Sequence, residues 1–159
     1  MKHIIGIATW NYREGTLAQR IDRFAEMGYT AVSLSAADAR ALAKGEAPDV
    51  EAAIRRHDLA ITIHAGLAPK GEPLQHDAIL ADFSLFAQWH KRSGALVSIN
   101  YDAAKLQTGD GKWEFQSAAM VRALEDMLEM SVAAGFSVGV EDWPRDAEQS
   151  GFVDHLRRY

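Results

Sequence analysis

Three short apolar segments of this chain end in side chains that bind metal ions or form hydrogen bonds. His64 follows one such segment, Asn100 ends a second and Glu141 ends a third. Neutral imidazole is the commonest metal ligand in proteins, and carboxylates suit hard divalent cations. A carboxylate in line with a buried strand is costly unless it is paired, hydrogen-bonded or bound to a metal ion. Glu141 is therefore either a metal ligand or acid–base catalyst, or an exposed carboxylate that caps the next segment.

The other candidates each have a structural explanation beside the functional one. His64 alone is better explained as a histidine that satisfies a nearby carbonyl, but together with Glu141 it favours a binding site. Asn100 either binds a polyol or belongs to a turn. Trp10 and Trp143 flank the first and last of the apolar segments. Their aromatic faces suit stacking on a sugar ring, and they suit equally the closing of a hydrophobic rim.

These residues must be positioned by alternating strands and helices. Runs rich in β-formers cover 4–9, 31–35, 60–64, 95–100 and 137–141, and segments with helical periodicity lie between them. Gly28, Gly94 and Gly135 are expected to end three of the helices. Thr16, Asp49 and Ser117 are expected to cap the starts of helices.

Alternation of this kind predicts an α/β fold with a parallel sheet. The polar residues described above follow the strands, and ligands bind at this edge in parallel α/β folds. The segment 101–116 contains Gly109, Gly111 and Trp113 and is expected to be a loop that can act as a lid.

Length, composition and charge exclude or disfavour several classes of protein. The 159 residues suit one domain, 1–159, and the absence of cysteine excludes disulfide scaffolds, thiolate metal sites and thiol nucleophiles. The net charge is −5 with no cluster of basic residues, which disfavours a nucleic-acid partner. No apolar run is long enough to span a membrane and no targeting segment is visible, so a cytoplasmic location is expected. The histidines outside the strand ends, His3, His57, His76, His90 and His155, are expected to be solvated.

Three segments resemble the xylose-isomerase-like TIM barrels. Residues 17–35 resemble the first helix and second strand of that superfamily, residues 61–65 its third strand, and Val138-Gly139-Val140-Glu141-Asp142-Trp143-Pro144 its fifth strand. The superfamily includes sugar and sugar-phosphate isomerases and epimerases, and also the family 2 apurinic-site endonucleases. The resemblance therefore implies a parallel (β/α) repeat of a TIM barrel, truncated after about the fifth strand.

The resemblance also implies roles for individual residues. Glu141 matches a carboxylate ligand of a divalent metal ion (Mn, Mg, Zn or Co), and His64 matches a histidine that binds metal or lines the substrate pocket. Asn100 stands where some members have a histidine, which weakens the endonuclease interpretation. The implied function is the N-terminal part of a metal-dependent sugar isomerase or epimerase, with an incomplete metal site and no activity by itself.

A non-catalytic α/β binding or assembly module is the alternative. Its open sheet edges would invite pairing with a second copy of the chain. The strand order separates the two hypotheses. A sequential order indicates part of a barrel, whereas an order such as 2-1-3-4-5 indicates an independent doubly wound domain.

Overall fold

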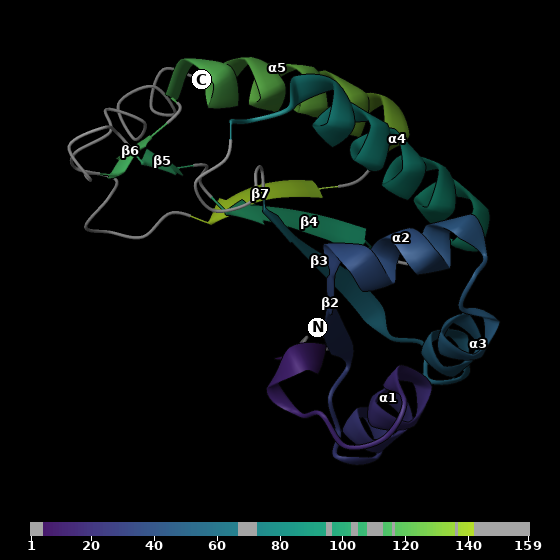
Figure 1. Cartoon of the computed structure of the whole chain (residues 1–159). Coiled ribbons are helices and arrows are strands. Elements are labelled where there is room, and N and C mark those ends of the chain that lie inside the picture. The colour runs from purple at the N-terminus through teal and green to yellow at the C-terminus, as the bar shows by residue number, and fades with distance from the viewer. Residues whose placement is uncertain are drawn as a thin grey trace.

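The computed structural model describes residues 5–66, 73–94, 97–102, 105–107, 113–115, 117–135 and 137–141. Residues 65–66, 97–102, 105–107, 113–115, 117 and 139–141 are described by their backbone alone. The described residues form a curved parallel sheet whose convex face is covered by helices (Figure 1). The sheet strands are β1 (Gly6–Ala8), β2 (Ala31–Ser35), β3 (Ala60–Gly66), β4 (Val97–Asp102) and β7 (Ser137–Glu141). The helices are α1 (Leu17–Glu26), α2 (Ala36–Lys44), α3 (Pro48–Arg56), α4 (His76–Ser93) and α5 (Ser117–Ala134).

The strands lie in the order β1-β2-β3-β4-β7, and every neighbouring pair is parallel. The order thus follows the chain, as it does in a (β/α) barrel. A doubly wound sheet would reverse direction within the order. The predicted α/β fold built from parallel (β/α) repeats is confirmed.

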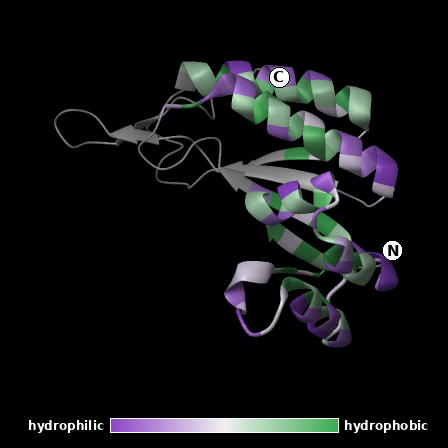
Figure 2. Ribbon diagram, turned by 45° about the vertical axis from the view of Figure 1, so that its right-hand side comes forward, coloured by the Kyte–Doolittle hydropathy of each residue, from purple (hydrophilic) through white to green (hydrophobic). Residues whose placement is uncertain are grey.

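The alternation of β2 and β3 separates an apolar face of the sheet from a polar one. Val32, Leu34, Ile61 and Ile63 are buried in the core that the helices cover. The alternate positions of the same strands hold serine, threonine and histidine that are only half-buried. Figure 2 shows the described parts of these strands as mainly apolar and the helices as mixed, which is the pattern of helices with one face against a sheet.

The first helix begins as the sequence predicts. The Thr16 hydroxyl accepts a hydrogen bond from the Gln19 backbone N–H at 3.3 Å, and the Gln19 side chain accepts one from the Thr16 N–H at 2.9 Å. This reciprocal pair satisfies two of the N–H groups that a helix start leaves without partners. Gly94, which follows α4, has the positive φ of 67° that a left-handed helix end requires.

The expected cap at Asp49 is wrong. Ala47 is the residue before α3, Pro48 takes the first helical position and Asp49 lies within the first turn. The proline ring fixes φ near its helical value and has no N–H to leave unpaired, so the helix begins two residues earlier than expected. Ser117 is the first residue of α5 rather than a residue before it.

The structure differs from the sequence prediction in two regions of the chain. Helix α2 lies between β2 and α3, where a single helix was expected. Within 101–116, strand β4 extends to Asp102, and β5 (Lys105–Gln107) pairs antiparallel with β6 (Trp113–Phe115). The segment is therefore not simply a loop. Among the described residues, no helix is both long and apolar enough to cross a membrane.

Candidate functional site

The register of the sheet places the predicted site positions on one face. His64 pairs with Ser35 on one side and with Asn100 on the other. Two residues further along the strands, Asp102 pairs with Glu141. Because residues two apart in a strand share a face, positions 64, 100 and 141 all belong to the polar, concave face.

Positions 64 and 141 are near enough for a shared ligand. Their strands are two strand spacings apart, roughly 9.6 Å across the sheet, and the two positions are offset by two residues, roughly 6.6 Å, along the strands. An imidazole and a carboxylate at these positions suit a divalent cation. Among the side chains that the structure describes, no three His, Asp or Glu residues are grouped closely enough to hold a metal ion. The metal role of Glu141 and His64 stays a prediction.

Trp10 is brought against His64 by the turn that follows β1. A short 3-10 helix, Thr9–Asn11, carries Trp10 across the end of the sheet. The Trp10 and His64 ring centroids are 5.4 Å apart and their planes are tilted by 47°. Trp10 keeps 38% of its surface exposed, so one aromatic side chain at the strand ends remains available for a ligand.

Thr9 is an anchor of this turn. Its side chain is 1% exposed, and its hydroxyl donates a hydrogen bond to the Ser33 carbonyl at 3.0 Å. The hydroxyl thus fastens the end of β1 to β2. Trp143, the second predicted tryptophan of the site, lies outside the described residues.

A charged cluster lies beside this turn. The Tyr12 hydroxyl donates a hydrogen bond to the Glu14 carboxylate, and Arg23 Nη1 donates to the same hydroxyl at 2.6 Å. The bond to Glu14 raises the pKa of Tyr12 above its ordinary value of 10.0, partial desolvation adds to the rise, and the Arg23 charge opposes it. Tyr12 therefore stays neutral and acts as a hydrogen-bond donor across the physiological range.

The expectation that His57 and His76 are solvated is wrong. His57 Nε2 lies 2.8 Å from Asp22 Oδ1, and His76 Nε2 lies 2.7 Å from Asp126 Oδ2. Each pair joins two helices that are distant in the sequence. His90 is half-buried. His3 and His155 lie outside the described residues.

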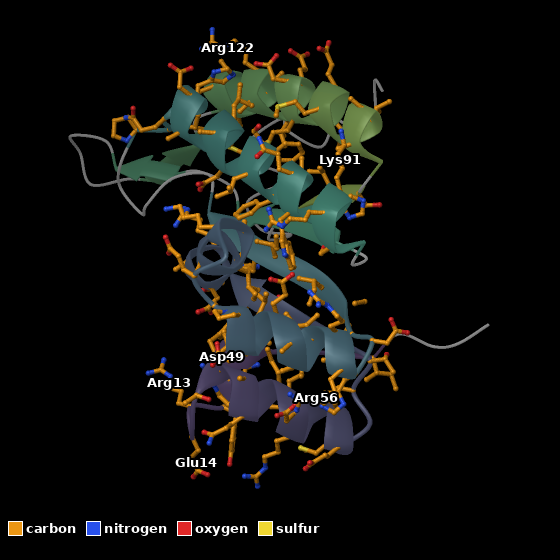
Figure 3. The ribbon with its side chains drawn as sticks, turned by 90° about the vertical axis from the view of Figure 1, so that its right-hand side faces the viewer. Arg13, Glu14, Asp49, Arg56, Lys91 and Arg122 are labelled. Atoms are coloured by element: carbon orange, nitrogen blue, oxygen red, sulfur yellow. The ribbon has the colours of Figure 1, made fainter. Side chains whose placement is uncertain are left out.

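A hollow of about 430 Å³ lies in the helix layer and not at the strand ends. It is lined by Leu74, His76, Ala119, Arg122, Glu125 and Asp126, from the start of α4 and the first half of α5. Figure 3 shows Arg122, one of these residues, at the top of the molecule. None of the described residues that line it is at a strand end, and the sheet edge with Trp10 and His64 remains the candidate site.

Comparison with solved structures finds three proteins that share the fold of this chain. A 3-keto-D-glucoside 4-epimerase from E. coli is 15% identical, with a TM-score of 0.62 over 91% of this chain and 58% of its own. A D-psicose 3-epimerase determined in the presence of D-fructose is 11% identical, with a TM-score of 0.61 over 86% and 51%. A xylose isomerase domain protein from Alicyclobacillus acidocaldarius is 20% identical, with a TM-score of 0.56 over 86% and 49%.

These likenesses establish the fold. No family model matches the chain, and no curated protein matches it either. The chain spans about half the length of the solved structures that it resembles. The resemblance to xylose-isomerase-like barrels that the sequence predicted is thus confirmed in the fold.

Proposed function

We propose that this chain is the N-terminal part of a divalent-metal-dependent isomerase or epimerase that acts on a sugar or sugar phosphate. The observation that carries the proposal is the Trp10–His64 contact at the strand ends, on the face that also holds positions 100 and 141. An exposed indole beside an imidazole suits a polyol, because it combines an apolar stacking face with a hydrogen-bonding group. The two epimerases that share the fold support the same substrate class.

Each residue would have a distinct role. The face of Trp10 would pack against the sugar ring, and His64 and Asn100 would form hydrogen bonds with its hydroxyls. An ionised Glu141 would accept or return a proton at the carbon next to the carbonyl. A divalent metal ion held by Glu141 and His64 would polarise the carbonyl and the neighbouring hydroxyl.

The metal site can be tested with Mn²⁺ alone. We expect residues 1–159 to bind Mn²⁺ weakly, measured by the loss of the free Mn²⁺ signal in electron paramagnetic resonance. Glu141→Gln should weaken binding by about tenfold or more, whereas Glu129→Gln, which removes the same charge from an exposed position on α5, should have little effect. Equal affinities of the wild type and Glu141→Gln would exclude Glu141 as a ligand.

The sugar site can be tested with D-fructose. Titration should perturb the His64 imidazole resonance. Trp10→Ala should raise the dissociation constant by about 2- to 12-fold, since an aromatic contact contributes about 0.5–1.5 kcal/mol. Trp10→Phe is the conservative control and should retain much of the affinity. We expect no turnover by residues 1–159 alone, and robust isomerisation by them would refute the assignment of this chain as part of the catalytic unit.

Self-association through the open edges of β1 or β7 is a separate prediction about the partner. Leu128 and Val132 of α5, the helix that precedes β7, are 48% and 84% exposed, and so form an apolar surface near that edge. Light scattering at high protein concentration tests the prediction. A single monomeric species would count against it.

A further inference from the structure

Arg20 joins α1 to the turn that carries Trp10. Its Nη1 atom donates one hydrogen bond to the Thr9 carbonyl at 2.6 Å and a second to the Tyr12 carbonyl at 3.0 Å. These two carbonyls lie on either side of Trp10 and Asn11 in the chain. A single nitrogen therefore fixes both ends of the turn.

The turn has little other support of its own. No side chain caps its start at Ala8. The Thr9 hydroxyl fastens one end to β2, but nothing comparable among the described residues holds the backbone after Asn11. Arg20 Nε is buried and finds no acceptor among the described residues. Within the described part of the chain, the guanidinium therefore leaves its Nε–H unpaired while it donates to two backbone carbonyls. A buried N–H without an acceptor is costly, which indicates that the position of Arg20 serves the turn rather than its own packing.

Arg23 provides a natural comparison on the same helix. It lies one turn further along α1, where its Nη1 donates to the Tyr12 hydroxyl, and its guanidinium carbon lies 5.0 Å from the centre of the Tyr12 ring. It contacts the Tyr12 side chain, whereas Arg20 contacts the backbone on both sides of Trp10. The two arginines have the same charge and different targets.

We infer that Arg20 is a positioning residue that holds Trp10 against His64 and so sets the aromatic wall of the strand-end site. The functional part of this inference rests on the proposed function, because the wall matters only if a ligand packs against it. Loss of Arg20 leaves the core of α1, Ile21 and Phe24, in place and frees the turn at its far end. Trp10 then loses its fixed orientation toward the imidazole.

The orientation is measurable without any ligand. In NMR spectra of the full chain with isotope-labelled histidine, the ring current of Trp10 shifts the His64 resonance. The variant His64→Gln identifies that resonance by its loss. The variant Trp10→Leu gives the chemical shift that His64 has without the indole ring. We expect Arg20→Met to move the His64 resonance most of the way to the Trp10→Leu value. Arg23→Met should leave it near the wild-type value. Arg20→Lys should give an intermediate shift, because its single ammonium nitrogen can still donate to both carbonyls but sits on a more flexible side chain than a guanidinium.

The same spectra report whether the variants fold. The resonances of His57 and His90, on other elements, should stay in place in Arg20→Met. If Arg20→Met unfolds, the positioning role is judged from Arg20→Lys instead. A His64 resonance at the wild-type position in a folded Arg20 variant overturns the inference. The ketohexose titration described above separates the two proposals. An Arg20-dependent His64 shift with no response to the sugar supports the positioning role and refutes the sugar site, whereas a sugar response that is unchanged in Arg20→Met refutes the positioning role.

Discussion

The two pairs of neighbouring helices at either end of the sheet are joined in different ways. Helices α1 and α3 are short, and the Asp22 carboxylate joins them by accepting from Arg56 at 2.9 Å and contacting His57 at 2.8 Å. Helices α4 and α5 have 18 residues each and lie side by side (Figure 1). The fully buried Phe83, Phe86 and Met127 lie on this second pair.

Both pairs include a contact between histidine and aspartate, but the surroundings differ. His57 follows the end of α3, close to Arg56, which Figure 3 shows near the foot of the molecule. There Asp22 receives two donors and is one-third exposed. Asp126 is about half exposed and borders the open hollow in the helix layer. The same pair of residue types is therefore expected to contribute more at α1–α3 than at α4–α5, where apolar burial dominates.

The largest effect is expected from Phe86→Ala. Removing a fully buried aromatic side chain should lower the free energy of unfolding by about 3–5 kcal/mol, through lost burial and the cavity left behind. Urea denaturation followed by circular dichroism measures the change. Gln88→Ala, at an exposed position of the same helix, is the control and should cost little. A loss below about 1 kcal/mol for Phe86→Ala would mean that α4 is not held by its apolar face.

A smaller loss is expected from Asp22→Ala. The change removes the acceptor of two hydrogen bonds between α1 and α3, and should cost about 1–2 kcal/mol at neutral pH and low salt. Asp22→Asn, which keeps an acceptor oxygen without the charge, should recover part of the loss. High salt should narrow the difference between wild type and Asp22→Ala, since the groups are partly exposed.

Asp126→Ala is expected to cost less still, about 0–1 kcal/mol, because a histidine–carboxylate contact this exposed gains little. The same denaturation assay compares it directly with Asp22→Ala. If Asp126→Ala proves the more damaging of the two, the contrast between the helix pairs is wrong, and the rim of the hollow has a structural role of its own.

The last prediction concerns the pKa of Tyr12, beside α1. The hydrogen bond to Glu14 favours the neutral phenol in the folded protein, so its contribution is fully present below the ordinary pKa of 10.0 and is lost as pH rises through the raised value. Glu14→Gln should bring the pKa of Tyr12 down. This pKa is measured from tyrosinate absorbance during a pH titration, and subtracting the titration of Tyr12→Phe isolates the signal of Tyr12. Glu129→Gln is the charge-matched control, and a wild-type pKa in Glu14→Gln would contradict the assigned cause.

The strands could be predicted from the sequence because each is a short apolar run bounded by turn residues. Helix α2 was missed for a local reason. Its alanine-rich sequence has little periodicity, and Ser35 both ends β2 and caps the helix by accepting from the Asp38 N–H. The hairpin of β5 and β6 was missed because pairing of two three-residue strands depends on contacts that no single segment shows.

The site was predictable only in part. The positions of His64, Asn100 and Glu141 on one face follow from strand alternation and register. The role of Arg20 was missed, because its partners are backbone carbonyls 11 and 8 residues away that exist only once α1 folds back over the end of β1. The partners of His57 and His76 lie 35 and 50 residues away, beyond any helical spacing.

The sequential strand order has a consequence for how the chain is made. Each strand pairs with the strand that precedes it in the sheet order. No strand of the described sheet has to be inserted between two strands that were synthesised before it. Domains generally fold as units, the N-terminal ones first during synthesis. The residues that form the turn with Trp10 and its arginine are translated before Asn100 and Glu141, and later strands can pair at the free edge of the sheet without displacing earlier ones.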